Sequence, residues 1–252
     1  MIPVLPSALL EAEPITGAYP LSSIALTALL DFAGLSLAIW TLWSSIWLQL
    51  GGHLLRAFRL ISVGSLAFAL SHLLDTILQF LAIDAATLIH QGAALLSVLF
   101  FLPGLAGLAD AIPAFNAAKA GQLQPLRFWP IAVGLIILIS AGSFVLYGVG
   151  EVSETAAFIA LDGSLVILGG VCLALVVRAR LGGPIGRSLW LSLLGLLLFG
   201  LAHPAQVWFY EETNYPADLL GIVHRLIVIP AFFLFAISIT SAARSLNTSI
   251  TA

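Results

Sequence analysis

Six ionisable side chains lie inside long apolar stretches of this 252-residue chain, where such groups are costly to bury and usually serve a function. Four are histidines and two are aspartates: His72, His90, His203, His224, Asp31 and Asp162. Imidazole binds haem iron and divalent transition metals, and a carboxylate either ligates the metal or orients an imidazole. These six residues are therefore the candidate site.

The six residues occupy equivalent positions of an internal repeat. A gap-free alignment of residues 31–72 with residues 162–203 is followed, after a slightly longer loop, by a second matching segment. The polar matches are Asp31 with Asp162, His72 with His203, and His90 with His224. Between them lie further matches, Gly64 with Gly195 and Phe68 with Phe199. Because polar residues are scarce in this chain, the polar matches indicate a duplication.

A b-type haem is the first cofactor that this pattern predicts. Two histidines on facing helices can bind the iron from its two axial sides, so His72, His90, His203 and His224 could hold one haem or two. Glycines about two turns away in the same spans would let a porphyrin approach the backbone. No cysteine haem-attachment motif is present, so a haem b would be bound non-covalently and would serve electron transfer.

A single divalent metal ion, bound or transported, is the alternative. Imidazole and carboxylate together suit Zn²⁺, Fe²⁺ or Mn²⁺. The ligands would then be Asp31, Asp162, His72 and His203. In a third interpretation the six side chains bind no cofactor and only form hydrogen bonds between helices, in a structural membrane subunit.

Two further charged residues lie close to the histidines in the chain. Asp75 follows His72 by about one helical turn, and Arg225 directly follows His224. Three carboxylates remain open as the ion-pair partner of Arg225: Asp31, Asp162 and Asp218. A buried arginine requires such a partner, so we expect Arg225 to bind one of them.

Composition places these residues in a membrane protein. Only 8% of the residues are charged, against about 25% in ordinary soluble domains, and 61% are hydrophobic. A soluble fold would need more charge to cover its surface. A net charge of −3 with a single lysine excludes a nucleic-acid surface. We therefore expect an all-α integral membrane protein with the lipid bilayer as its main environment.

Seven stretches are long and apolar enough to cross a bilayer, which takes about 20 residues of α-helix. They are residues 21–50, 57–82, 86–110, 128–148, 156–178, 188–210 and 217–243. Lys and Arg follow the first, third, fifth and seventh spans, whereas the loops at the opposite ends carry acidic residues and no Lys or Arg. The positive-inside rule then predicts an external N-terminus, a cytoplasmic C-terminus and a multi-pass location in an inner or plasma membrane.

The spans and the repeat together predict a parallel 3+1+3 organisation. Residues 1–20 are an extramembrane arm, 21–111 the first three-helix repeat, 112–150 a connector with the fourth span, 151–244 the second repeat, and 245–252 a tail. Parallel repeats place their sites at the interface between the halves. The extramembrane segments are short, so we expect other membrane or periplasmic subunits to supply any electron-donating or catalytic domain.

The sequence lacks the motifs of several well-known protein classes. The sole lysine, Lys119, lies in a predicted loop, so a retinal Schiff base inside the membrane is excluded. No P-loop, dinucleotide fingerprint, HExxH motif or GxSxG motif is present. The sequence thus predicts a cofactor- or metal-binding membrane protein without naming a reaction.

Overall fold

The computed structural model describes residues 21–48, 52–81, 86–111, 129–151, 154–179, 183–213 and 217–250. Within these residues the chain is all-helical. The helices are α1 (Leu21–Ile46), α2 (Gly52–Phe80), α3 (Ala86–Ala111), α4 (Trp129–Gly148), α5 (Glu154–Ala179), α6 (Gly183–Thr213) and α7 (Ala217–Ile250). Each helix coincides with one predicted apolar range, and α2, α6 and α7 extend beyond theirs by five or more residues.

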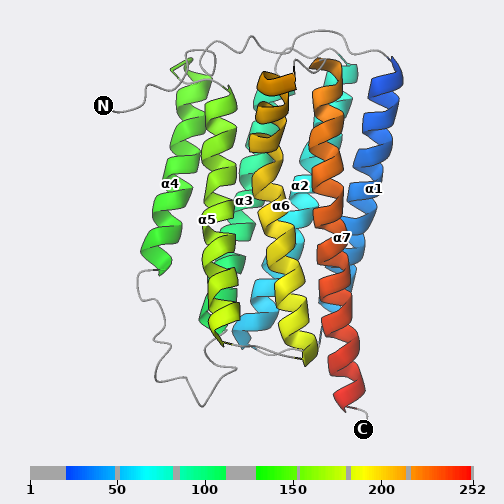
Figure 1. The fold of residues 1–252 in the computed structure, drawn as a ribbon, viewed down its shortest axis with the longest axis vertical. Coiled ribbons are helices and arrows are strands. Elements are labelled where there is room, and N and C mark those ends of the chain that lie inside the picture. The colour runs from blue at the N-terminus through cyan, green and yellow to red at the C-terminus, as the bar shows by residue number, and fades with distance from the viewer. Residues whose placement is uncertain are drawn as a thin grey trace.

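The helices lie side by side in one bundle (Figure 1). Each helix packs on its neighbour in the sequence, and α7 packs on α1, so the bundle is closed. In addition, α3 packs on α5 and α2 meets α7. The contact between α2 and α7 joins the second predicted span to the last.

Three of the described helices are long and apolar enough to cross a membrane. The candidate spans are Ile24–Ile46, Leu54–Leu78 and Ile222–Arg244. Trp40 and Trp43 of α1, and Trp47 directly after it, are 55%, 60% and 59% exposed, an arrangement that suits lipid rather than water. In lipid the backbone must satisfy its own hydrogen bonds, which explains why such apolar segments form helices. The chain is therefore a helical membrane protein.

The centre of the bundle is filled by phenylalanine rings, which we call the aromatic core. Its members are Phe68 of α2, Phe101 of α3, Phe199 of α6, and Phe232 and Phe235 of α7. All are at most 2% exposed. The ring centroids of Phe68 and Phe199 lie 4.8 Å apart, and Phe101 stacks on Phe235 at 6.2 Å. Four helices are thus joined by direct ring contacts.

Two glycines make room for these rings. A Cβ atom on Gly64 would lie 2.9 Å from the ring of Phe101, and a Cβ on Gly195 would lie 3.2 Å from the ring of Phe235. The separation at Gly64 is shorter than real Cβ contacts, so a side chain there would force the ring of Phe101 to move. At Gly195 the contact is tight, and a side chain would require a shift of a few tenths of an ångström. The space beside these two glycines, where the sequence suggested a porphyrin, is filled by phenylalanine rings.

Candidate functional site

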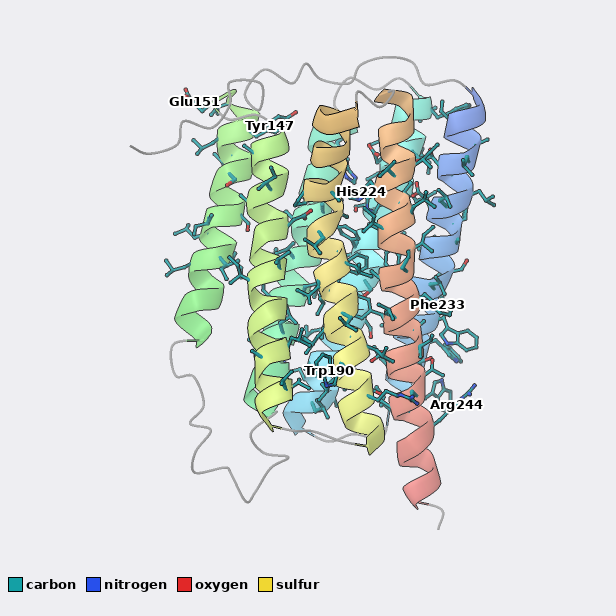
Figure 2. The ribbon with its side chains drawn as sticks, in the orientation of Figure 1. Tyr147, Glu151, Trp190, His224, Phe233 and Arg244 are labelled. Atoms are coloured by element: carbon teal, nitrogen blue, oxygen red, sulfur yellow. The ribbon has the colours of Figure 1, made fainter. Side chains whose placement is uncertain are left out.

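Two histidines meet where α2 and α7 come together. The Nε2 atoms of His72 and His224 lie 3.3 Å apart, and their rings are 4.8 Å apart and tilted by 47°. The two residues are only 4% and 3% exposed. Phe68, one turn before His72, contacts the His72 ring edge-on at 4.7 Å. The pair therefore lies directly on the aromatic core, towards the N-terminal end of α7 (Figure 2).

A third imidazole, His90 of α3, lies next to this pair. Its ring centroid is 5.3 Å from that of His72, and its Nδ1 atom lies 2.9 Å from the backbone oxygen of Ser71. A carbonyl oxygen only accepts, so Nδ1 of His90 donates, and the lone pair of the neutral ring is on Nε2. Histidines that bind metals are commonly oriented by this kind of hydrogen bond to a backbone carbonyl.

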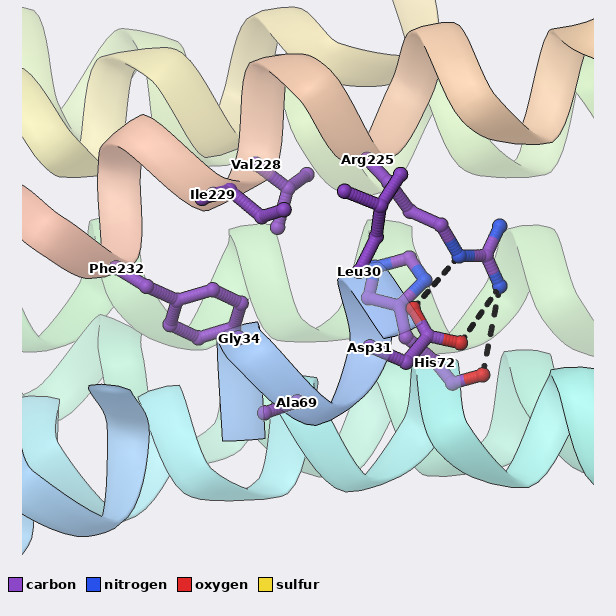
Figure 3. A pocket seen from close by; sticks show the side chains of 9 residues that line it. All are labelled: Leu30, Asp31, Gly34, Ala69, His72, Arg225, Val228, Ile229 and Phe232. Atoms are coloured by element: carbon purple, nitrogen blue, oxygen red, sulfur yellow. Dashed lines mark hydrogen bonds and ion pairs between the residues drawn. The ribbon is translucent and has the colours of Figure 1, made fainter. Parts of the chain in front are cut away.

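Arg225 forms a buried ion pair with Asp31 of α1. Its Nε atom donates to Asp31 Oδ1 at 2.6 Å, and Nη2 donates to Asp31 Oδ2 at 3.1 Å (Figure 3). Both residues are buried, at 5% and 4% exposed. Of the three carboxylates that the sequence left open, Asp31 is thus a partner of Arg225. A two-point contact of this kind balances the charge of the guanidinium and also fixes its orientation.

The ion pair also ties α1 and α7 to α2. Thr76 of α2 donates its hydroxyl hydrogen to Asp31 Oδ2 at 2.6 Å and accepts from Arg225 Nη2 at 2.9 Å. The same nitrogen lies 3.5 Å from Asp75 Oδ2 and 3.5 Å from the backbone oxygen of His72. Because Arg225 follows His224 in the chain, these contacts hold α7 in the rotation that turns His224 towards His72.

Two carboxylates share one guanidinium in the described contacts. Arg225 lies between Asp31 and Asp75, and it contacts Asp31 at 2.6 Å and Asp75 at 3.5 Å. In the low dielectric of a bundle interior such charge pairs interact more strongly than they would in water.

The space beside the ion pair is small. A cavity of about 10 Å³ lies between α1, α2 and α7, and Asp31, His72 and Arg225 are part of its lining (Figure 3). A single buried water needs about 10–15 Å³ of such volume. The cavity can thus hold at most one water or an ion of similar size.

The remaining predicted residues lie elsewhere or outside the described side chains. Asp162 is fully buried in α5, and its backbone oxygen lies close to Gly200 of α6. His203 belongs to α6 and Asp218 to α7, but their side chains lie outside the described part of the structure. Among the side chains that the structure does describe, no three histidines, cysteines or acidic residues are close enough to hold one metal ion.

One member of the network was not predicted from the sequence. Thr76 bridges Asp31 and Arg225, yet a threonine in an apolar helix has nothing to set it apart from the other hydroxyl residues of the chain. The only sequence signal is its spacing, since it lies one turn after His72 and on the same face of α2.

The described side chains do not fit a haem shared by His72 and His224. Metal–imidazole bonds are about 2 Å long, so two axial nitrogens lie about 4 Å apart with the porphyrin between them. The Nε2 atoms are 3.3 Å apart and in direct contact. In addition, the phenylalanine rings occupy the space at Gly64 and Gly195.

The chain matches no protein-family model, no curated protein and no solved structure. Its function is therefore inferred from the chemistry of the site.

Proposed function

We propose that this protein is a multi-pass membrane protein that binds a transition-metal ion between α2 and α7, through the Nε2 atoms of His72 and His224. The supporting observation is the 3.3 Å separation of these two atoms. Two imidazoles on a tetrahedral ion, each with a bond of about 2.0–2.1 Å, have nitrogens about 3.3 Å apart. The same distance permits a hydrogen bond, so the ion would replace a proton shared by the two rings.

The chemistry of the ligands favours Zn²⁺, with Fe²⁺ next. Imidazole suits both ions, whereas Mn²⁺ prefers oxygen ligands. The oxygens of Asp31 already accept from Arg225 and Thr76, so we assign Asp31 the role of charge partner rather than ligand. His90 lies next to the pair and is oriented by the contact of its Nδ1 with the backbone oxygen of Ser71. His203 is equivalent to His72 in the repeat. These two histidines are the proposed further ligands.

We also propose the parallel 3+1+3 repeat, with seven membrane spans. Residues near a twofold axis contact their own equivalents. Phe68 and Phe199 match in the sequence and their rings are in contact, and Phe101 stacks on Phe235, its equivalent in the second repeat. The packing of α7 on α1 likewise has a counterpart in that of α3 on α5. These pairs support an axis that runs along the bundle.

The proposed orientation has the histidine pair in the outer half of the membrane. It rests on the distribution of Lys and Arg, which predicts a cytoplasmic C-terminus. The ion would then reach the site from the external or periplasmic side. Acidic residues predominate in the loops on that side, and they would raise the local concentration of cations.

The decisive experiment measures the metal content of the full-length chain after purification in detergent and incubation with Zn²⁺. We expect about one ion per chain, and on the order of a tenfold weaker affinity in His72→Ala and in His224→Ala. His53→Ala, at the start of α2, is the matched control and should bind as the wild type does. Size-exclusion profiles confirm that each variant is folded. Metal-free wild type, or unchanged binding in both variants, would disprove the proposal.

An optical spectrum of the same sample tests the haem prediction. A Soret band that sharpens on reduction, and that His72→Ala removes, would replace the metal ion with a haem and would require α2 and α7 to separate. A colourless protein with stoichiometric zinc would support the metal site. The two measurements together distinguish the two cofactors on one preparation.

A further inference from the structure

A groove runs along the outside of the bundle between α1 and α7, in the half that contains the C-terminal end of α7. Its volume is about 420 Å³. Its wall includes Leu37 and Trp40 of α1 and Phe233, Ile237, Thr240 and Arg244 of α7. Phe233 and Arg244 lie on the side of α7 that is turned towards α1 (Figure 2). The groove is thus separate from the histidine pair, which lies towards the other end of α7.

Most of the groove wall is apolar. Its two central polar groups contact each other, since Trp40 Nε1 donates to Thr240 Oγ1 at 2.9 Å. Ser44 Oγ lies 3.1 Å from the same hydroxyl. Among the described residues that line the groove, only Arg244 is charged, and it lies at one end. The groove therefore offers a hydrophobic surface that ends in a cation.

The length of the groove matches one leaflet of a bilayer. From Phe233 to Arg244 the helix rises about 16 Å, and half of a hydrocarbon core is about 15 Å. The apolar span of α7 ends at Arg244, and Trp43 and Trp47 lie exposed near the end of α1. Tryptophan and arginine are both typical of the level of the lipid headgroups. Phe233 then lies near the middle of the membrane.

We propose that this groove binds one phospholipid with an anionic headgroup. One acyl chain of the lipid packs against Leu37, Phe233 and Ile237, and the phosphate group of the lipid binds Arg244. An apolar groove alone would accept any lipid chain, so the preference for an anionic headgroup rests on the arginine. In the orientation proposed above, this lipid belongs to the cytoplasmic leaflet, which is rich in anionic lipids.

The test is native mass spectrometry of the full-length protein with phosphatidylglycerol and phosphatidylcholine of identical acyl chains. We expect the wild type to bind phosphatidylglycerol about fivefold more tightly, the factor that one basic residue near an anionic surface contributes. Arg244→Gln should abolish this preference. Arg59→Gln is the matched control, because Arg59 is an exposed arginine at the same end of the bundle, on α2 and not among the residues that line the groove.

A second variant tests the groove itself. Ile237→Trp adds a large side chain to the wall and should weaken the binding of both lipids by a similar factor. Equal binding of the two lipids by the wild type would overturn the proposal. So would an equal loss in Arg59→Gln and Arg244→Gln, which would indicate diffuse surface charge. A dimer that Ile237→Trp dissociates would also overturn it, because a second copy of the chain would then occupy the groove.

Discussion

The polar network around His72 and the aromatic core are adjacent, but they connect the helices in different ways. In the aromatic core, Phe68 contacts Phe199 and Phe101 stacks on Phe235, so equivalent residues of the proposed repeats meet. In the polar network His72 contacts His224, which is not its own equivalent. A twofold axis pairs such a contact with a second one between His90 and His203, and the side chain of His203 lies outside the described residues. The core keeps the symmetry of the proposed duplication, whereas the network departs from it at Arg225.

The departure can be traced to one residue. Arg225 has Gln91 at the equivalent position of the first repeat, so only one of the two repeat-related aspartates can have this arginine as its partner. Asp31 is the one that does. Apolar rings can pack equally well against equivalent residues of two repeats. A buried charge, by contrast, needs one particular counter-charge.

The largest effect is expected from breaking the ion pair on one side. Asp31→Asn removes the two-point carboxylate partner of Arg225 and leaves Asp75, 3.5 Å away, as the remaining carboxylate among the described contacts. The free energy of unfolding should fall by about 3 kcal/mol, the lower end of the range for breaking a buried ion pair. Unfolding in mixed micelles measures this loss. Adding Arg225→Met to Asp31→Asn removes the guanidinium, but Asp75 then loses its contact with that cation, so only part of the loss should be recovered. A loss below about 1 kcal/mol in the single variant would mean that water reaches the guanidinium.

A smaller effect is expected from overfilling the aromatic core. The Cβ atom of Gly64→Ala would lie 2.9 Å from the ring of Phe101. Overpacking costs about 1–3 kcal/mol, and it outweighs the gain of roughly 1 kcal/mol in helix propensity. Gly92→Ala is the matched control, because no atom lies within 4 Å of its added Cβ, and it should be neutral or stabilising. Equal effects of the two changes would show that the core can readjust.

The positions of the helices could be predicted from the sequence, but the rotation of each helix could not. Apolar length determines where a helix lies, and every predicted range coincides with one helix. Hydropathy is nearly uniform around these helices, so it does not indicate which face meets which neighbour. The contact of His72 with His224 joins residues far apart in the chain and depends on that rotation. The pairing of Arg225 with Asp31 also depends on the rotation of the helices, so the sequence left its partner open.

Another prediction compares the ion pair with a neutral hydrogen bond between helices in its contribution to the free energy of unfolding. The hydroxyls of Ser192 in α6 and Ser238 in α7 lie 2.6 Å apart in the interior. Ser192→Ala should destabilise the protein by about 0.6–1.7 kcal/mol, the range for hydrogen bonds between membrane helices. Ser62→Ala is the control, since Ser62 bonds only to Phe58 of its own helix among the contacts described, and it should change little. A loss comparable to that of Asp31→Asn would make neutral contacts equally important.

The smallest change in stability is expected when the polar network is made aromatic. In His72→Phe the new ring can keep the edge-on contact with Phe68, while the contact with His224 is lost. With a chelator present, we expect the free energy of unfolding to change by no more than about 1 kcal/mol. With Zn²⁺ at 100 times its dissociation constant, the wild type should gain about 2.7 kcal/mol and His72→Phe almost nothing.

This pair of conditions separates a ligand from a structural histidine. A purely structural His72 would give the opposite pattern, with a large loss in chelator and an unchanged response to zinc. If His72→Phe is stable and still gains from zinc, the ion binds elsewhere, and the short contact with His224 is an ordinary hydrogen bond. If His72→Phe is stable and its stability no longer rises with Zn²⁺, metal binding explains why two imidazoles are kept in the interior next to the aromatic core.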